Sequence, residues 1–260
     1  MSANDPGNGG KDERVRIDET PYLREVRIKP SAEGNDPPGG HPFNIPAVRA
    51  LDGLCFGPGV TFFIGENGAG KSTVLEGLAA ALGHGPEGGT RNVRLSTNGA
   101  VSPLGERLRL VRGHRTPRDH YFLRAETFFN VATYMDEVRY LGEYGNRSLH
   151  ARSHGEAFMA VLLSKLKGEG LYLFDEPEAA LSPARQMAAL VAIHQLVRTG
   201  SQFVIATHSP ILLAYPGARI LCFDEEGIHE VPYSQAEPYV ITRDFLNHPQ
   251  ARVQRLLDGT

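Results

Sequence analysis

The stretch that most constrains the fold runs from Gly65 to Thr73 and reads G-E-N-G-A-G-K-S-T. A short β-branched and aromatic run, 60–64, precedes it and predicts a buried strand. Apolar residues at helical spacing follow it and predict a helix; they are Val74, Leu75, Leu78 and Leu82. A strand, a glycine-rich loop and a helix N-terminus together direct backbone N–H groups and the helix dipole at one place, which favours an anion there.

The fixed positions of this loop match the pattern G-x-x-x-x-G-K-[ST], so the expected anion is the phosphate chain of a nucleotide. In that pattern Lys71 reaches the β- and γ-phosphates, and the Ser72 hydroxyl ligates Mg²⁺. The alternative, a glycine-rich turn beside a surface lysine, is disfavoured by the flanking strand and helix. The candidate nucleotide-binding residues are Gly65, Glu66, Asn67, Gly68, Ala69, Gly70, Lys71, Ser72 and Thr73.

Two later apolar runs also end in polar residues. The run 170–174 leads to Asp175 and Glu176, and 203–206 leads to His208. Buried parallel strands deliver such residues to the carboxyl edge of a sheet, where ligands bind. Asp175 is expected to bind Mg²⁺, and Glu176 to orient or deprotonate the attacking water. His208 is expected to contact the γ-phosphate; the alternative for it is a satisfied loop histidine.

A fourth segment, Ser153-His154-Gly155-Glu156, precedes apolar residues at helical spacing. The pattern S-x-x-E is a capping box, which stabilises a helix N-terminus in any protein. Such an N-terminus can also meet an anion, here a phosphate held by another subunit. Both readings are compatible.

Taken together, these segments resemble the ATPase head of the ATP-binding-cassette (ABC) family. Ser153 and Gly155 then match the signature motif, which lies 22 residues before Asp175, and His208 matches the switch histidine, 32 residues after Glu176. The resemblance covers about 21–225. It implies an α/β fold with a mainly parallel central sheet, helices on both faces and an antiparallel edge subdomain. It also implies ATP hydrolysis with Mg²⁺, in an ATP-dependent homodimer in which Ser153 faces the opposite subunit's ATP.

The sequence departs from the family pattern in three places. The signature reads Arg152-Ser153-His154-Gly155-Glu156, with a bulky histidine where a glycine is usual, and Ser182 replaces the D-loop aspartate. No glutamine stands at the Q-loop, where Glu126 is the nearest candidate and a possible metal ligand. Ser182 is instead suited to cap a helix, with Pro183 at its first position. The D-E-P-E form at 175–178 is more similar to small stand-alone bacterial ATPases, and to SMC-, RecF- and OLD-like proteins, than to transporter subunits.

Composition is typical of one folded domain, expected at 21–260 after a disordered tail at 1–20. With 41% hydrophobic residues in a chain of 260, a full core can form. No apolar run is long enough to span a membrane, and Met1–Arg16 lacks a secretory apolar region, so we expect a cytoplasmic protein. The two cysteines, Cys55 and Cys222, form no C-x-x-C pair, and this pattern predicts no zinc site.

The segment Arg91–Arg124 is expected to be a variable insertion of loops and short elements. It holds eight arginines against two acids, a local excess of +6 in a chain whose net charge is −3. The segment could therefore bind nucleic acid or an acidic partner. It could equally be a solvated face, or face the bound nucleotide.

Two other regions carry weaker expectations. Between Tyr22 and Val60 we expect an antiparallel edge with a Pro/Gly loop at 33–40. ABC heads stack adenine on an aromatic residue here, so Tyr22 and Phe43 are candidates, although both also suit the core. The end of the chain, 242–260, predicts one or two short helices without evident chemistry.

Three functions remain open on the sequence alone. The first is a stand-alone ATPase in DNA maintenance or defence, which the D-E-P-E form and the arginine segment favour. The second is the motor subunit of a membrane transporter, which the altered signature disfavours. The third is a nucleotide-gated binding module without hydrolysis.

Overall fold

The computed structural model describes residues 21–30, 40–90, 102–128, 130, 131, 133 and 153–259. Several sequence expectations lie outside these residues and stay predictions. They concern the tail 1–20, most of the loop 33–40, and Arg91, Arg94 and Arg152.

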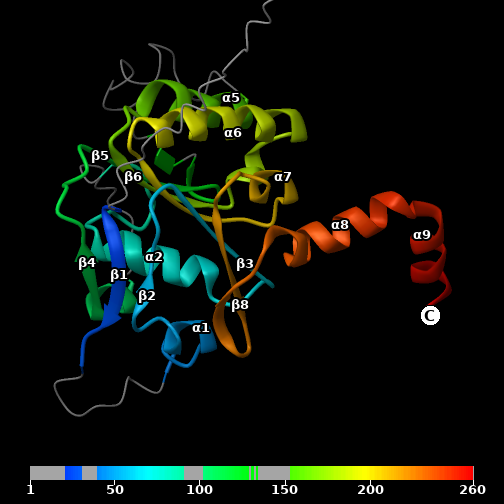
Figure 1. Ribbon diagram of the computed structural model, residues 1–260, viewed down its shortest axis with the longest axis horizontal. Helices are drawn as coiled ribbons and strands as arrows, with labels where there is room; N and C mark the ends of the chain where they lie inside the picture. Colours follow the sequence, from blue (N-terminus) through cyan, green and yellow to red (C-terminus); the bar gives the residue numbers. More distant parts are fainter. Residues whose placement is uncertain are drawn as a thin grey trace, which may run out of the picture.

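A six-stranded sheet in the order β5-β6-β7-β3-β8-β9 forms the centre of the described fold (Figure 1). Its first five strands run parallel, and β9 is antiparallel to β8. Every residue of β3, β6 and β7 is buried, which explains their unbroken apolar runs. The strands are β3 (Val60–Gly65), β5 (Asp119–Arg124), β6 (Gly170–Asp175), β7 (Gln202–Ala206), β8 (Arg219–Asp224) and β9 (Gly227–Glu230).

Residues of β3 alternate between two hydrophobic cores, because successive side chains of a strand point to opposite faces. Phe62 and Ile64 pack in one core with helices on the upper side of Figure 1. Phe63 packs in the other, with α2 (Lys71–Ala81) and the smaller sheet. The helical elements of the first core are α5 (His154–Ala160), the π-helical turn η2 (Val161–Lys165), α6 (Pro183–Arg198) and α7 (Pro210–Leu213).

A three-stranded antiparallel sheet, in the order β2-β1-β4, covers the second core. It confirms the antiparallel edge expected between Tyr22 and Val60. Gln202 of β7 links the two sheets: its Oε1 accepts the Leu23 N–H at 2.9 Å, and its Nε2 donates to the Leu23 carbonyl at 2.9 Å. The remaining elements on this side are β1 (Leu23–Ile28), β2 (Leu54–Cys55), β4 (Leu108–Arg112), and the short helices α1 (Pro46–Arg49) and α3 (Pro103–Arg107).

The described part of the arginine segment is built of short elements, as expected, and its strands belong to both sheets. It supplies β4 to the small sheet and β5 to the central sheet. Two of its described arginines have partners elsewhere in the chain: Arg107 donates to the Lys29 carbonyl, and Arg118 pairs with Glu169. The segment therefore contributes to the fold, and Arg107 and Arg118 contact different parts of it.

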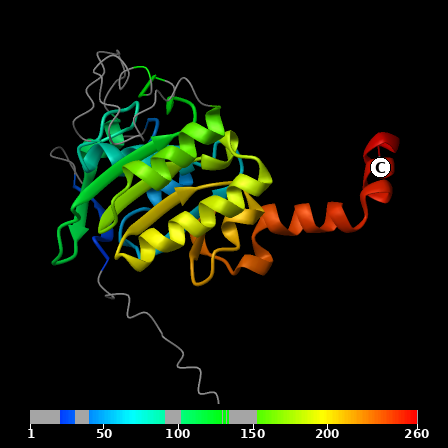
Figure 2. The same ribbon diagram turned by 90° about the horizontal axis from the view of Figure 1, so that it is seen from above.

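The end of the chain forms the short helices expected there, α8 (Glu237–Asn247) and α9 (Pro249–Asp258). Seen from above, they extend away from the body of the molecule (Figure 2). The 3₁₀ turns η3 (Pro177–Ala180) and η4 (Tyr233–Gln235) complete the described elements. Among the helices of the described residues, none has the length and apolar character needed to cross a membrane.

Candidate nucleotide-binding site

The loop between β3 and α2 has the strand–loop–helix context that its sequence predicts. β3 ends at Gly65, and α2 begins at Lys71 directly after Gly70, whose φ of 98° lies in the left-handed region. A Cβ at Gly65 would collide with the carbonyl oxygen of Phe223 on the neighbouring strand β8. Glycine is therefore required at both ends of the loop, and the N-terminus of α2 opens toward the space that the loop encloses.

Lys71 lies folded into this loop. Its Nζ donates to the carbonyl oxygens of Gly65, at 2.7 Å, and Glu66, at 2.9 Å. Burial lowers the pKa of Lys71, while the carboxylates of Glu176 and Asp175 act in the opposite direction. The Lys71 amino group thus has two carbonyl acceptors at the centre of the loop, and phosphate oxygens can replace them as its hydrogen-bond partners.

Ser72 and Asp175 meet across the cleft between α2 and the end of β6. The Ser72 hydroxyl donates to Asp175 Oδ1 at 3.0 Å. Burial raises the pKa of Asp175 to about 6, although the Ser72 hydrogen bond and the positive charge of Arg124 oppose this. Two oxygen donors, one of them a poorly solvated carboxylate, therefore face each other beside the phosphate loop.

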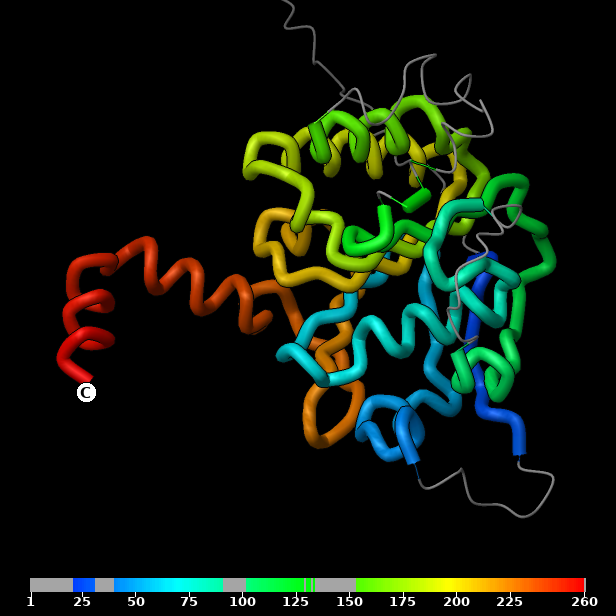
Figure 3. The backbone as a smooth tube through the Cα atoms, turned by 180° about the vertical axis from the view of Figure 1, so that it is seen from behind, coloured from blue at the N-terminus to red at the C-terminus, as the bar shows by residue number. Residues whose placement is uncertain are grey.

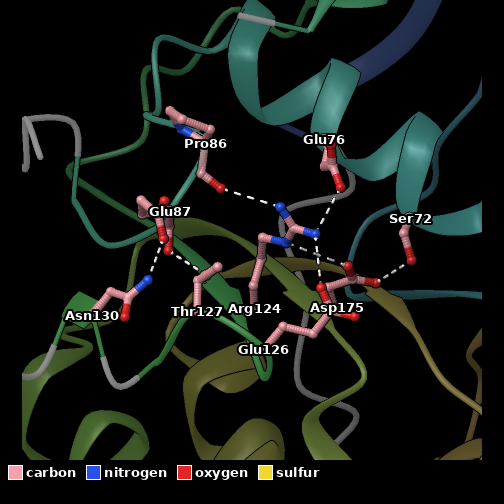
Figure 4. Close-up of polar contacts among 9 residues, drawn as sticks. All are labelled: Ser72, Glu76, Pro86, Glu87, Arg124, Glu126, Thr127, Asn130 and Asp175. Carbon is pink, nitrogen blue, oxygen red and sulfur yellow. Dashed lines mark hydrogen bonds and ion pairs between the residues drawn. The ribbon is translucent and has the colours of Figure 1, made fainter. Parts of the chain in front are cut away.

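Arg124, at the end of β5, connects the elements around Asp175 (Figure 4). Its Nη2 lies 2.8 Å from Glu76 Oε1 on α2 and 3.3 Å from Glu126 Oε2, and its Nε lies 3.8 Å from Asp175 Oδ2. The sequence singled out this arginine only as part of a basic segment. The sequence carries no signal for its role at the site, because Glu76 and Asp175 are distant from it in the chain.

The segment after β5, which holds Glu126, is fixed to the chain that follows α2. Thr127 Oγ1 donates to the Glu87 carbonyl at 2.7 Å, and Asn130 Nδ2 donates to Glu87 Oε2 at 2.8 Å (Figure 4). The Glu126 side chain is 81% exposed. These contacts hold the backbone in place while the Glu126 carboxylate reaches solvent beside the cleft.

Glu176 and His208 stand at the ends of neighbouring strands, as their positions after two apolar runs predict. Glu176 has a φ of 50° and its N–H donates to the Ala206 carbonyl at 3.0 Å. His208 Nε2 lies 3.9 Å from Glu176 Oε1. The Glu178 carboxylate accepts the backbone N–H of His208, and burial raises the pKa of Glu178. One acid thus holds the histidine loop, and the other remains half-exposed beside the histidine.

The phosphate loop, Glu126, Glu176 and His208 line one open cleft of about 1130 Å³. This exceeds the volume of most small-molecule pockets, roughly 300–1,000 Å³. The cleft also takes residues that the sequence did not single out, from the segment before α1 and from the start of α8. They are His41, Ile45, Glu237, Pro238, Ile241 and Thr242.

Ser153 and Gly155 do not line this cleft. Ser153 forms the expected capping box with Glu156, and its Oγ also accepts from Arg185 Nη1 at 3.0 Å. A Cβ at Gly155 would collide with the backbone carbonyl oxygen of Ala180 in η3 (Pro177–Ala180) and with the Arg185 guanidinium, so this glycine permits α5 to pack against the turn before α6. Within one chain, the two residues are therefore placed at a helix start outside the nucleotide cleft.

The candidate adenine-stacking residues Tyr22 and Phe43 are not at the site. They are 4% and 6% exposed, belong to the second core, and do not line the cleft. Of the two readings that the sequence left open, the structure confirms the core: both aromatic side chains are used in packing. His41 and Ile45 occupy the corresponding edge of the cleft instead.

One group of metal-ligand type lies on the β8–β9 hairpin among the described residues, formed by Cys222, Asp224 and His229. Asp224 Oδ1 accepts the N–H groups of Glu226 and Gly227 at the hairpin turn. Its other oxygen lies 3.4 Å from His229 Nδ1. Asp224 is therefore accounted for by the turn and by its cross-strand partner.

Comparison with known proteins places the chain in a family. Two AAA-domain family models match it in part: one at residues 44–115, and one, whose description names the AbiEii toxin of Type IV TA systems, at 157–214. The hemin import ATP-binding protein HmuV of Pseudomonas fluorescens is 30% identical over 203 residues, covering 69% of this chain and 76% of that protein.

Two further relatives are more distant. The ABC transporter G family member STR2 of Medicago truncatula is 22% identical over 58% of this chain, which spans only 24% of that protein. The solved structure of cbiO1 from Clostridium perfringens, part of the ABC transporter complex cbiONQ, is 18% identical, with a TM-score of 0.45 over 91% of this chain and 99% of that one. Given the match to HmuV and the loop, strand and helix arrangement described above, the chain belongs to the ABC-type P-loop ATPases, enzymes that bind and hydrolyse ATP.

Proposed function

We propose that the protein is a stand-alone cytoplasmic ATPase that acts as a dimeric switch: two copies close on ATP and separate after hydrolysis. One observation carries this. The cleft gathers the phosphate loop, Glu176 and His208 from one chain but leaves out Ser153 and Gly155. A second copy, related by a two-fold axis, could bring its own α5 N-terminus to the open side of the cleft.

Within one copy, the proposed chemistry is an in-line attack of water on the γ-phosphate. Lys71 would exchange the carbonyls of Gly65 and Glu66 for β- and γ-phosphate oxygens. Glu176 would orient the water and accept its proton, and His208 would hydrogen-bond the γ-phosphate. The proximity of Glu176 and His208 supports this division of roles, since both could reach the same reacting centre.

The residues beside the loop fit a magnesium ion. Ser72 Oγ and Asp175 Oδ1 are hard oxygen donors 3.0 Å apart, the ligand type that Mg²⁺ prefers. Glu126 is a proposed further ligand; its carboxylate would first have to leave Arg124. When bound, Mg²⁺ neutralises charge on the β- and γ-phosphate oxygens.

For the client of the switch, we propose DNA maintenance or defence. The Asp175–Glu178 sequence supports this, as does the match to the family model whose description names the AbiEii toxin. The arginine segment supports it less than its composition suggested, because Arg107, Arg118 and Arg124 have partners within the chain.

A second candidate is the motor subunit of a transporter, which the similarity to HmuV favours. The two candidates differ in what they bind. A pull-down from the native host with the ATP-trapped protein would recover an integral membrane protein if the chain is a motor, and soluble defence or DNA-repair components if it stands alone.

The proposed chemistry is tested with Glu176→Gln, which keeps the size and hydrogen bonding of the side chain but removes the carboxylate. We expect turnover to fall at least about 10²-fold, the usual contribution of a general base, while ATP binding persists. With ATP and Mg²⁺ this variant should dimerise in light scattering after size exclusion.

Lys71→Ala serves as the control, because it should lose ATP binding itself. Near-normal turnover of the Glu176→Gln variant would transfer the water-handling role to another group. A trapped, ATP-bound protein that stays monomeric would contradict the dimeric switch.

A further inference from the structure

The helices α8 and α9, residues 237–258, form an arm that carries almost no burial. Neither helix has a buried residue. Seen from behind, the arm leaves the body and ends far from it (Figure 3). Asp244 of α8 pairs with Arg252 of α9, and this hydrogen bond lowers the pKa of Asp244. The elbow between the helices is thus held by polar contacts.

The arm also exposes most of the large apolar side chains found on the described surface. Seven of the ten lie on it: Val240, Ile241, Phe245, Leu246, Val253, Leu256 and Leu257. Leu257 is 78% exposed and Leu246 is 68% exposed. Positions 253, 256 and 257 have the spacing of one helix face. Helices of this length are marginal in water alone, so such a face indicates a partner.

The root of the arm identifies where that partner sits. Glu237, Pro238, Ile241 and Thr242 line the nucleotide cleft together with the phosphate loop. A second copy that closes the cleft would therefore meet the start of the arm first. The arm carries three acids and three arginines, which suits neither a nucleic acid nor a strongly acidic surface.

The three other exposed large apolar residues lie in the helical layer over the first core. They are Leu163 in η2, and Met187 and Val191 in α6. Met187 and Val191 are four residues apart on α6, whose first turn holds Arg185 against Ser153. The proposed function brings Ser153 to the partner's cleft, and hence brings α6 toward the root of the partner's arm.

We propose that each arm clasps the second copy in the ATP-bound dimer, with its apolar face on the Met187–Val191 surface of α6. The inference rests on the proposed function, because the dimer is the one that closes the cleft. Two-fold symmetry makes the contact reciprocal, so one dimer contains two clasps. Since the arm begins at the cleft, its seating on the partner is coupled to the presence of nucleotide.

The test uses the full chain with Glu176→Gln as the parent. Leu256→Glu combined with Leu257→Glu should weaken the ATP-dependent dimer at least about tenfold in sedimentation equilibrium, since two charges would enter an apolar contact. Met187→Glu should act in the same direction. Asn247→Glu combined with Gln250→Glu is the matched control, because it adds two charges at exposed polar positions of the arm.

Two more readouts separate the arm from the site. Affinity of the monomer for a fluorescent ATP analogue should not change in the leucine variant, because these leucines do not line the cleft. Amide hydrogen exchange in 249–258 should slow in the parent only when ATP and Mg²⁺ are both present.

The outcomes distinguish this inference from the proposed function. A dimer of normal affinity in the leucine variant overturns the clasp and leaves the ATP switch intact. A parent that is dimeric without ATP, and that the leucine variant dissociates, supports the clasp and overturns ATP control. A parent that binds ATP as a monomer overturns both. If the protein co-floats with phosphatidylglycerol vesicles, and the amides of 249–258 stay unprotected from hydrogen exchange in the dimer, the clasp is overturned and the arm binds a membrane surface instead.

Discussion

At the scale of single residues, the main feature of the site is a carboxyl group, that of Asp175, which is buried away from water. Asp175 is 6% exposed, and burial raises its pKa to about 6 against the Ser72 hydrogen bond and the Arg124 charge. An ionised carboxylate held there lowers the free energy of unfolding of the unliganded protein, by about 3 kcal/mol as an order of magnitude. A bound cation would reverse this, so the same burial that destabilises the empty site favours metal binding.

We predict that Asp175→Asn stabilises the empty protein at pH 7.5. Because the folded pKa is raised, the group's stabilising contribution is present below pH 4 and is lost as pH rises through about 6. The amide cannot ionise, so its advantage should shrink toward pH 4–5. Calorimetry without nucleotide or Mg²⁺ should show a melting temperature several degrees higher at pH 7.5, at roughly 2–4 °C per kcal/mol.

The exposed Asp258→Asn is the control for this experiment, and it should shift the melting temperature little at either pH. If the melting temperatures of Asp175→Asn and the wild type differ by the same amount at both pH values, ionisation of Asp175 is not the cause of the difference. Turnover with Mg²⁺ and ATP should meanwhile be lost in Asp175→Asn, since the proposed metal ligand is weakened.

At the scale of elements, two serines cap the helices that pack beside each other. Ser182 Oγ accepts the Arg185 N–H at the start of α6, and Ser153 Oγ accepts the Glu156 N–H at the start of α5. Both caps were expected from sequence, because a capping pattern is local and needs no knowledge of the fold. The two serines differ in their proposed role: only Ser153 is expected to meet the partner's ATP.

We predict that Ser182→Ala and Ser153→Ala each lower the free energy of unfolding by about 1 kcal/mol, the usual contribution of an N-cap. Chemical denaturation would measure both losses. Only Ser153→Ala should also weaken ATP-dependent dimerisation. If the two variants dimerise equally well, the signature segment is a helix cap and nothing more.

The elements also show which parts of the fold are readable from sequence. The strands β3, β6 and β7 were predicted because each is a continuous apolar run followed by a distinctive polar residue. The positions of β4 and β5 in the two sheets were not predicted. Their arginines interrupt the apolar pattern of a strand, and the strands that they pair with lie elsewhere in the chain. Arg124, His41 and the root of α8 reach the site in the same way, through contacts between segments distant in sequence.

At the scale of the whole molecule, Gln202 joins the two sheets. Its amide satisfies both backbone groups of Leu23, a residue 179 positions away, and also donates to the Gly57 carbonyl at 3.0 Å. Gln202 is 2% exposed and Leu23 is fully buried, so water cannot easily replace these bonds. Backbone groups left without partners in such a place are costly.

We predict that Gln202→Ala lowers the free energy of unfolding by about 2–5 kcal/mol, because it leaves buried N–H and C=O groups unsatisfied and opens a small cavity. The midpoint of urea unfolding would measure this. Gln195→Ala, at an exposed position of α6, is the matched control and should have little effect. A small loss for Gln202→Ala would mean that apolar packing alone holds the sheets together.

The strand order has a consequence for how the protein folds during translation. β3 leads directly into the phosphate loop, yet its two neighbours in the sheet are β7 and β8, which are made much later. Gly65 itself packs on Phe223 of β8. A nascent chain that has completed the loop but not β7 therefore has neither of the strands that flank β3, and Gly65 gains its contact with Phe223 only when β8 is complete. We therefore expect stable ATP binding only after most of the domain has been translated, and bound ATP then stabilises the fold by mass action.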